Sequence, residues 1–518
     1  MKVSRDRSVE LGRMVRSLIQ RYSGLFAIGW IGVVAIIVLA ERLAQIPIHV
    51  SLNYNEGWNA YQAAYAFGPE PLYPPLDALV SNNYPPLSFY IVGGIGQILG
   101  DNVIAGRWVS LLSMVAVAMG VGWLVGRRLG QSALGVFTGL FFLAAFAHYY
   151  RGYVGIDDPQ MLAHALQMGV LVWLIEGWRD QARSGGRADT GVSRSLVGAS
   201  VLMGFSLLVK HNLLAMPAAI AIWLFMHRRR ASFAFVAIVT GMVAISFGLF
   251  HLIYGPNFLT GLLEAPRTYS LLVGVANMER WLEPQGWLIG LGVFLGATQW
   301  RDLEIQLMGW FAGFSLLLGM AIAGGAGVNY NAVFDATIAL CLLVGLALSQ
   351  QANRYPLAQT NLARPSQWRL SSAQFAAAIA LCVLFLTFLP TKLQTLSTVV
   401  ADTQALRLQA AEDVALIASY EDPVICEHLA MCYFAGKPLG IELFNFGQKL
   451  RSGLISEADW IEQVESQAFS LFYMKKDSEL LTKPVYQAIS AYYEPFRLTT
   501  YRNYDYEFWR PRSAAAGG

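Results

Sequence analysis

The sequence is short of charge. Only 14% of its 518 residues are Asp, Glu, Lys or Arg, whereas 55% are apolar, and the mean hydropathy is +0.44. In soluble globular domains about a quarter of the residues are charged, so this chain has roughly half the usual fraction of charged residues. The shortage lies within residues 25–390, because the residues after 390 have an ordinary globular composition. The composition therefore excludes a soluble enzyme and predicts a polytopic membrane protein with a globular C-terminal part.

Several enzyme motifs are also missing. The chain has no P-loop, no Gly-x-Ser-x-Gly elbow and no dinucleotide-binding fingerprint, and its seven dispersed histidines lack zinc spacing. Of the four cysteines, Cys341 and Cys382 fall in apolar stretches, where they act as small apolar residues. Cys426 and Cys432 lie in the C-terminal part, where an oxidising compartment permits a disulfide that their spacing leaves open. No nucleic-acid partner is expected, and a transferase without a nucleotide site needs a donor that arrives through the lipid.

Apolar stretches define the membrane part. A helix needs about 20 mainly apolar residues to cross the hydrocarbon core, and the sequence predicts a mainly α bundle of about eleven such helices. They lie at 23–41, 103–126, 130–149, 159–177, 195–210, 212–227, 232–254, 286–300, 305–325, 332–350 and 373–390.

Basic residues predict the orientation, because cytoplasmic loops are rich in Lys and Arg. The basic segment 1–22 places the N-terminus in the cytoplasm, and the transmembrane domain then spans 23–390. On the opposite face, the loop 42–102 would hold juxtamembrane helices. Its apolar stretch 85–100 is interpreted as one of them, lying against the outer surface. The domain 391–518 would then be extracytoplasmic, which in a bacterium means the periplasmic side of the inner membrane.

The C-terminal domain has the pattern of a small α/β unit. Helices are predicted at 402–420, 457–467 and 479–493, and short strands at 423–426 and 468–474. An aromatic-rich hairpin runs through Trp509. Its tyrosines could stack on sugars, although a packed hairpin is the favoured explanation.

Acidic residues gather on the predicted outer face. Glu56 starts a predicted helix after the first span, and Asp157-Asp158 precede Pro159 just before another span. Each has an ordinary interpretation, as a glutamate favoured by the helix dipole or as a helix cap. Two carboxylate sites from separate loops are also what general-base catalysis or metal binding requires. We therefore treat Glu56, Asp157 and Asp158 as candidate catalytic residues.

Basic and polar residues share that face. Lys210 and His211 lie between two short spans, which indicates a hairpin tip recessed in a protein cavity, and Arg267 and Arg280 lie in a long outer loop. Such cations could pair with an anionic phosphate, although interfacial snorkelling also explains Lys210. A glycine-rich turn then leads through Asn329 and Tyr330 into a span with Asp335 one turn inside, and a buried carboxylate there needs partners.

The order of these motifs resembles the GT-C superfamily of membrane glycosyltransferases, in the branch with protein O-mannosyltransferases and lipid A aminoarabinose transferases. The resemblance covers residues 20–390, and each motif alone is weak. The matching pieces are Asn55-Glu56-Gly57-Trp58-Asn59-Ala60-Tyr61, Asn83-Tyr84-Pro85-Pro86-Leu87, Gly106-Arg107, Arg151 with Asp157-Asp158, Lys210, and Gly327-Val328-Asn329-Tyr330.

The resemblance implies a polyprenyl-phosphate-linked hexose or pentose as donor, transferred with inversion to a hydroxyl of a glycan, lipid or protein. The family's first acidic motif is usually Asp-Glu, but here the aspartate position is Asn55, which leaves Glu56 as the implied base. The family often has a lysine before Pro-Pro-Leu, where this chain has Tyr84. Phosphate contacts would therefore shift to Lys210, Arg267 or Arg280.

Alternatives stay open at this point. A flippase or transporter of lipid-linked sugars predicts inverted repeats, and none is apparent. An O-antigen-type polymerase or ligase would carry more arginine in its outer loop than Arg267 and Arg280. No cofactor is required, because cations can hold a phosphate leaving group, but a divalent cation between the acids is a further alternative.

Overall fold

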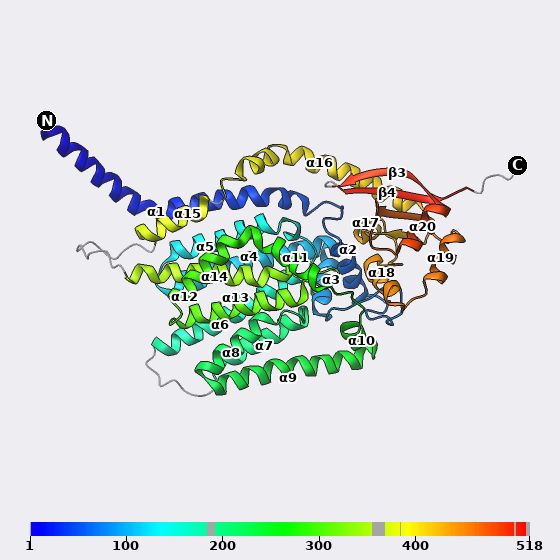
Figure 1. The fold of residues 1–518 in the computed structure, drawn as a ribbon, viewed down its shortest axis with the longest axis horizontal. Helices are drawn as coiled ribbons and strands as arrows, with labels where there is room; N and C mark the ends of the chain where they lie inside the picture. Colours follow the sequence, from blue (N-terminus) through cyan, green and yellow to red (C-terminus); the bar gives the residue numbers. More distant parts are fainter. Residues whose placement is uncertain (1, 184–191, 355–367, 384, 502–503, 514–518) are drawn as a thin grey trace.

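A computed structural model describes residues 2–183, 192–354, 368–383, 385–501 and 504–513. The helices of the first two-thirds of the chain run side by side along the long axis, and the strands gather at one end (Figure 1). The first helix, α1 (Lys2–Gln45), extends well beyond the bundle at the other end. The side chains of the predicted basic segment at its start lie outside the described residues.

Seven helices in the described part of the chain are long and apolar enough to cross a membrane, judged by length and composition. Each lies at a predicted span, and the chain is a multi-pass membrane protein. They are the Tyr22–Gln45 part of α1, α4 (Asn102–Arg128), α5 (Ser132–Tyr149), α6 (Gln160–Arg183), α9 (Arg229–Tyr254), α13 (Leu303–Ile322) and α14 (Phe334–Arg354).

The remaining predicted spans are shorter helices. They are α7 (Arg194–Val209), α8 (Ala215–His227), α12 (Gly286–Thr298) and α15 (Ser372–Val383), which all fall below the usual crossing length of about 17–25 residues. The prediction of one span at 373–390 was wrong in its extent. α15 ends at Val383 and a new helix, α16 (Leu389–Ser419), begins with Pro390 in its first turn, a position that suits proline.

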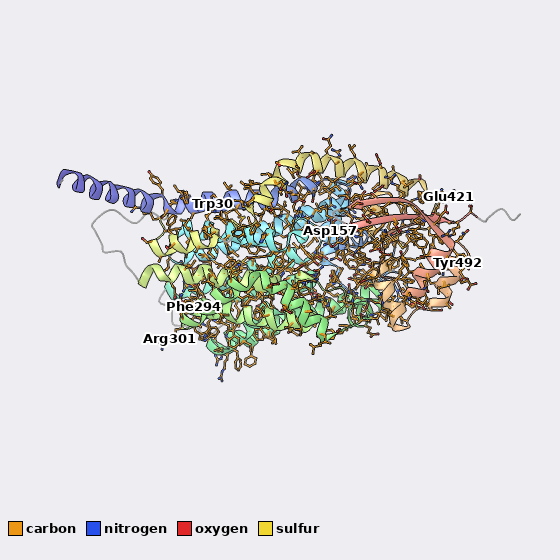
Figure 2. All side chains as sticks on the ribbon, turned by 45° about the horizontal axis from the view of Figure 1, so that its top comes forward. Trp30, Asp157, Phe294, Arg301, Glu421 and Tyr492 are labelled. Carbon is orange, nitrogen blue, oxygen red and sulfur yellow. A yellow bond between two sulfur atoms is a disulfide. The ribbon has the colours of Figure 1, made fainter. Side chains whose placement is uncertain are left out.

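The bundle is layered around one buried helix. The apolar window of α14 is 100% buried inside the protein, whereas that of α9 is only 11% buried. Large apolar side chains such as Ile245, Leu252 and Phe294 are exposed on the bundle surface, as expected for side chains that face lipid. Figure 2 shows Phe294 and Arg301 toward the end opposite Glu421 and Tyr492, with Asp157 between them.

Short helices cover the bundle at the end that carries the strands. They are α2 (Asn55–Tyr65), α3 (Leu87–Leu99), α10 (Asn257–Leu263) and α11 (Leu271–Leu282). α3 corresponds to the apolar stretch that we did not count as a span. It has 13 residues and packs against α2, α4 and α7. Its position at a membrane surface stays a prediction.

The C-terminal part is the predicted α/β unit. Its sheet has the order β1-β2-β4-β3, in which β1 pairs parallel to β2 and the other pairs are antiparallel. Trp460, Phe446, Phe472 and Tyr493 fill a core of its own. Its elements are β1 (Val424–Cys426), α17 (Leu429–Phe434), α18 (Leu443–Ser452), α19 (Glu457–Glu465), β2 (Leu471–Lys475), α20 (Lys483–Tyr492), β3 (Tyr493–Tyr501) and β4 (Tyr504–Pro511).

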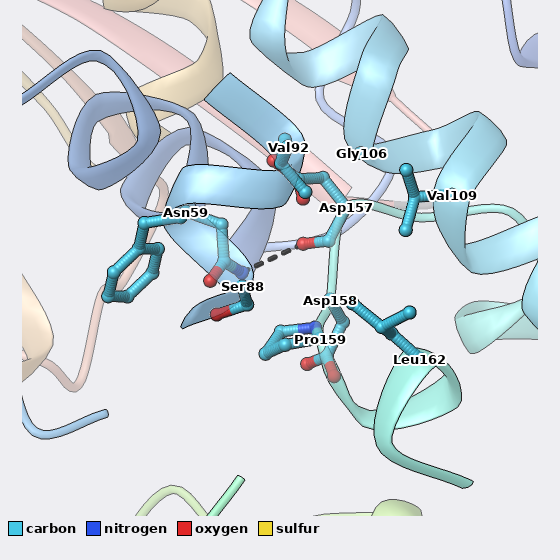
Figure 3. A pocket seen from close by; sticks show the side chains of 10 residues that line it. Asn59, Ser88, Val92, Gly106, Val109, Asp157, Asp158, Pro159 and Leu162 are labelled. Atoms are coloured by element: carbon cyan, nitrogen blue, oxygen red, sulfur yellow. Dashed lines mark hydrogen bonds between the residues drawn. The ribbon is translucent and has the colours of Figure 1, made fainter. Parts of the chain in front are cut away.

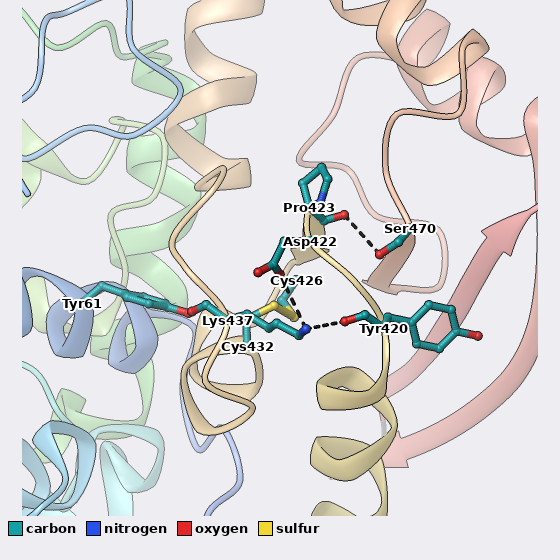
Figure 4. Close-up of a disulfide and its surroundings, with 8 residues drawn as sticks. All are labelled: Tyr61, Tyr420, Asp422, Pro423, Cys426, Cys432, Lys437 and Ser470. Atoms are coloured by element: carbon teal, nitrogen blue, oxygen red, sulfur yellow. Dashed lines mark hydrogen bonds and ion pairs between the residues drawn. A yellow bond between two sulfur atoms is a disulfide. The ribbon is translucent and has the colours of Figure 1, made fainter.

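A disulfide lies where this unit meets α2 (Figure 4). Cys426 and Cys432 are bridged, with their Cα atoms 5.9 Å apart. Just beyond the bridge, Lys437 donates to the carbonyl oxygen of Tyr420, and its own carbonyl accepts a 2.6 Å hydrogen bond from the Tyr61 hydroxyl. The bridged segment therefore connects the end of α16 to α2.

Gly57 allows α2 to contact the C-terminal unit backbone to backbone. A Cβ atom at this position would overlap the main chain of Leu429 and Ala430 in α17. We expect Gly57→Ala to separate the two parts and to lower the free energy of unfolding by about 1–3 kcal/mol, the usual cost of overpacking. Thermal unfolding in detergent measures it. Gly29→Ala is the matched control, because a Cβ at this helical glycine meets open space; equal stability of the two variants would contradict the close contact.

Candidate active site

A cavity of about 540 Å³ lies between the bundle and the C-terminal unit. This volume is within the range of about 300–1,000 Å³ that is usual for small-molecule sites. Polar side chains from both parts of the protein face it, and apolar side chains of several elements, among them Trp58, Leu318 and Phe444, line the rest. The polar groups that the argument below uses are Tyr54, Asn55, Tyr84, Gln160, Lys210, Arg267, Asn331, Asp335 and Glu442.

Lys210 lies in the turn between α7 and α8 and points into this cavity. Its side chain is 2% exposed, its ammonium lies 3.7 Å from a carboxylate oxygen of Asp158, and it lies 4.8 Å from the centre of the Tyr84 ring. The Tyr84 hydroxyl accepts a 3.4 Å hydrogen bond from it. The recessed tip expected from the two short apolar stretches is therefore present, and its cation is held among protein groups rather than in lipid.

Asp158 joins Lys210 to two other chain segments. One carboxylate oxygen accepts a 2.8 Å hydrogen bond from the backbone N–H of Gln160, as a capping aspartate does at the start of a helix such as α6. The other accepts a 3.2 Å hydrogen bond from the Asn55 amide. Asn55, Lys210 and Gln160 all line the cavity, whereas Asp158 is not part of its lining and borders a separate small void. Asp158 therefore caps α6 and contacts the cavity wall through these partners.

Glu56 points away from the cavity. Its side chain is fully buried and forms two hydrogen bonds with Arg107 of α4, at 2.7 and 2.9 Å. The backbone N–H groups of Leu52, Asn53 and Asp157 also donate to it. Both of its oxygens are therefore occupied. This geometry supports a structural role, and catalysis by Glu56 stays a prediction that the cavity lining does not favour.

Arg107 also donates hydrogen bonds to the backbone between α1 and α2. The chain after α1 has no regular structure as far as α2, so its carbonyl groups need donors from elsewhere. Arg107 donates to the carbonyl oxygens of Ile46, Ile48 and Val50 at 2.9, 2.7 and 2.5 Å. The N–H groups of the guanidinium that do not bond Glu56 therefore bond this segment and hold it against α4.

Asp157 lies beside a separate small void (Figure 3). The void measures about 10 Å³, which is room for about one water molecule. Three buried oxygens around it, Asp157 Oδ2, Asn59 Oδ1 and Ser88 Oγ, have no hydrogen-bond partner among the described residues. Burial raises the pKa of Asp157 well above its ordinary value, and the nearby carboxylates of Glu56 and Asp158 raise it further. Asp157 therefore favours its protonated form.

The C-terminal unit supplies the wall that sequence reasoning missed. Glu442 lies at the start of α18, where it accepts hydrogen bonds from the backbone N–H groups of Phe444 and Asn445 and a 2.5 Å bond from the Tyr54 hydroxyl. Arg267 lies over the Phe444 ring, 4.7 Å from its centre. Burial lowers the pKa of the Arg267 guanidinium, and Glu442 partly offsets this effect. Glu442 has no local signal in the sequence that points to the membrane part.

Other predicted site residues divide between the cavity and its surroundings. Asn329 lines the cavity, whereas Tyr330 packs against Trp281 behind it. Arg280 is exposed and lies 5.9 Å from the Tyr330 ring centre, so it does not join Arg267. His211 lies beside Lys210 but is not part of the lining. Among the described residues, no group of three or more His, Cys, Asp or Glu could hold a metal ion.

Comparison with known proteins identifies the fold. No protein-family model matches the chain, and no curated protein matches its sequence. Among solved structures, the crystal structure of ArnT from Cupriavidus metallidurans in the apo state aligns with a TM-score of 0.57 at 14% identity, covering 93% of this chain and 97% of that chain. The same protein bound to undecaprenyl phosphate aligns with a TM-score of 0.57 at 13% identity, covering 95% and 99%. The chain has the GT-C fold of ArnT. At this identity the likeness concerns the fold.

The buried pair leads to a stability prediction. Arg107→Met would leave the Glu56 carboxylate buried without its partner, and breaking a buried pair in this way usually costs about 3–5 kcal/mol. We expect a large loss of thermal stability in detergent. Arg280→Met, which removes an exposed arginine, is the control. Equal unfolding temperatures for the two variants would show that the pair does not hold the fold.

Asp157 leads to a prediction with a pH signature. An amide imitates a protonated carboxyl and can donate to Asn59 Oδ1, so Asp157→Asn should fold at least as well as the wild type. Because the folded-state pKa of Asp157 is raised, the wild type loses stability as the pH rises above the ordinary aspartate value of about 4. The stability of Asp157→Asn relative to the wild type should therefore increase with pH, which unfolding measured from pH 4 to 8 would test. A constant difference would contradict the raised pKa.

Proposed function

We propose that the protein is an integral membrane glycosyltransferase that moves a sugar from a polyprenyl-phosphate donor to an acceptor hydroxyl. The observation that carries the proposal is the buried Lys210 ammonium, held by Asp158 and Tyr84 on the wall of a cavity large enough for a sugar. The binding of undecaprenyl phosphate by ArnT, which has the same fold, supports a lipid-linked donor.

The donor phosphate would sit at Lys210. Lysine binds phosphate as a compact charge. The Tyr84 hydroxyl adds a hydrogen-bond donor, at the position where the GT-C family often has lysine. Arg267, which also lines the cavity and lies over Phe444, supplies a second cation. Neither cation belongs to the buried pair that holds α2 and α4 together, so each could turn to a substrate without breaking that pair.

The transfer would be an inverting displacement. An acceptor oxygen attacks the anomeric carbon, the bond from that carbon to the phosphate oxygen breaks, and the polyprenyl phosphate leaves with the electron pair. Asp158 takes the proton of the acceptor hydroxyl. As the phosphate arrives, Lys210 shifts from the Asp158 carboxylate toward the new anion, which leaves Asp158 available as the base.

The cavity would open on the periplasmic side of a bacterial inner membrane. Arg127, Arg128, Arg228 and Arg301 lie at or beyond the helix ends remote from the C-terminal unit, and basic residues favour the cytoplasm. The cytoplasmic segment 1–22, the transmembrane domain 23–390 and the periplasmic domain 391–518 follow from this orientation. A hexose or a pentose would serve equally as the transferred sugar, and a glycan, lipid or protein hydroxyl as acceptor.

The test is turnover by the purified protein in nanodiscs. A panel of radiolabelled polyprenyl-phosphate hexoses, pentoses and amino sugars is offered, with and without a chelator to examine cation dependence. We expect one donor to be consumed and Asp158→Asn to lower its turnover by about 10²–10⁴-fold, the usual contribution of a general base. No turnover of any donor would favour a transporter instead.

Controls separate chemistry from folding. Asp158→Asn leaves Lys210 without its carboxylate, so the double variant Asp158→Asn/Lys210→Met, which removes both charges, is measured for stability as well. Glu56→Gln is included in parallel. A folded Glu56→Gln that loses turnover, with an active Asp158→Asn, would return the role of base to Glu56.

Lys210 has a prediction of its own. Lys210→Met should weaken the binding of undecaprenyl phosphate by about ten- to a hundredfold, because a hydrogen bond to a charged group is worth about 1.5–3 kcal/mol. Equilibrium binding of the radiolabelled lipid measures it. Lys476→Met, at an exposed lysine of the C-terminal unit, is the control, and unchanged binding in Lys210→Met would remove the phosphate site from the cavity.

A further inference from the structure

A second polar cluster lies where α6 and α14 begin, beside the cavity. It consists of Gln160 and His164 of α6, Asn331 in the turn before α14, and Asp335 in the first turn of α14. Gln160, Asn331 and Asp335 face the cavity, and His164 lies behind them with its side chain fully buried. Carboxylates inside a membrane bundle are costly and by default mark function, and the transfer step above does not use this one.

The amides of the cluster set the protonation of His164. The Gln160 side chain and Asn331 form two hydrogen bonds, the Gln160–Asn331 clamp: Gln160 Nε2 donates at 2.7 Å to the backbone carbonyl oxygen of Asn331, and Asn331 Nδ2 donates at 3.0 Å to Gln160 Oε1. The second N–H of Gln160 faces His164 Nε2 at 3.3 Å. Nε2 is then an acceptor, so the proton of the neutral ring sits on Nδ1, which faces Asp335.

Asp335 is nevertheless unsatisfied. Its Oδ1 lies 3.4 Å from His164 Nδ1, yet neither atom has a hydrogen-bond partner in the described part of the chain. Asp335 is 8% exposed, and this exposure is toward the cavity that it lines. The positive end of the α14 dipole favours a carboxylate at this position. A buried carboxylate with free acceptor capacity requires a donor, and the cavity is where one could come from.

We propose that Asp335, positioned by His164 and flanked by the Gln160–Asn331 clamp, binds hydroxyl groups of the sugar that the donor carries. The proposal rests on the proposed function, because Lys210 and Asp158 set the position of the phosphate. Lys210 and Asp335 line the same cavity, so a sugar attached to a phosphate at Lys210 would share that cavity with Asp335. Acceptor-only carboxylates and amides at fixed positions are the groups that discriminate among hydroxyl patterns.

The test compares a lipid without sugar and lipids with sugar. Binding of undecaprenyl phosphate and of a panel of undecaprenyl-phosphate monosaccharides is measured for the wild type, Asp335→Asn and Lys210→Met. We expect the wild type to prefer one sugar-bearing lipid, and Asp335→Asn to weaken its binding by about ten- to a hundredfold while undecaprenyl phosphate binds as before. Lys210→Met should weaken both kinds of lipid.

Failure of this inference differs from failure of the proposed function. If Asp335→Asn keeps the sugar preference, or weakens both kinds of lipid equally, Asp335 does not bind the sugar. The phosphate site fails independently if Lys210→Met binds undecaprenyl phosphate normally. Asp402→Asn, which makes the same change at an exposed position of α16, is the matched control.

His164 has a separate readout. His164→Gln keeps a polar side chain but moves the group behind Asp335, so it should reduce the sugar preference without changing the binding of undecaprenyl phosphate. Analogues of the preferred donor that each lack one hydroxyl complete the test. The analogue without the hydroxyl that Asp335 binds should bind Asp335→Asn and the wild type equally well, and the absence of any such analogue would overturn the assignment.

Discussion

The buried ion pair between Glu56 and Arg107 is the interaction on which the site depends. Burying two charges is costly, and the cost is offset only where every donor and acceptor is satisfied. Here the guanidinium serves Glu56 and the carbonyl groups of the segment between α1 and α2, while Glu56 also accepts from three backbone N–H groups. One of these is the N–H of Asp157. The pair thus fixes the first helix, α2, α4 and the acidic loop relative to one another.

This arrangement positions the residues next to the pair at the cavity wall. Asn55, next to Glu56 in the sequence, donates a hydrogen bond to Asp158. Asp158 directly follows Asp157, whose backbone N–H donates to Glu56. Lys210 then completes the wall from the other half of the bundle. The C-terminal unit contacts the cavity wall through the hydrogen bond between Glu442 and Tyr54. Gly57 of α2 allows close backbone contact with the same unit. The cavity wall is therefore assembled from segments that lie far apart in the sequence and contact one another directly.

Much of the fold could be predicted from the sequence because membrane spans and strands carry local signals. Hydropathy located the long apolar helices, and the turn between α7 and α8 correctly indicated a recessed lysine, but α10 and α11 were not predicted. Local signals do not fix helix ends, so the break between Val383 and Leu389 was missed. Nor do they fix partners. Glu442 contacts Tyr54 across 388 positions, and the sequence does not show that Arg107 pairs with Glu56.

Glu56, Asp157 and Asp158 lie close together, but each has a different environment. Glu56 is neutralised by a guanidinium and cannot reach a substrate without leaving its partner. Burial raises the pKa of Asp157, which shares its void with two other unsatisfied oxygens and therefore favours its proton. Asp158 is paired with the ammonium of Lys210, and in the proposed transfer its charge would become available when that ammonium turns to the donor phosphate. Differences of this kind between neighbouring acids are what assign acid and base roles in well-understood enzymes. A base that is released by the arrival of the leaving group would also keep the empty site from activating water.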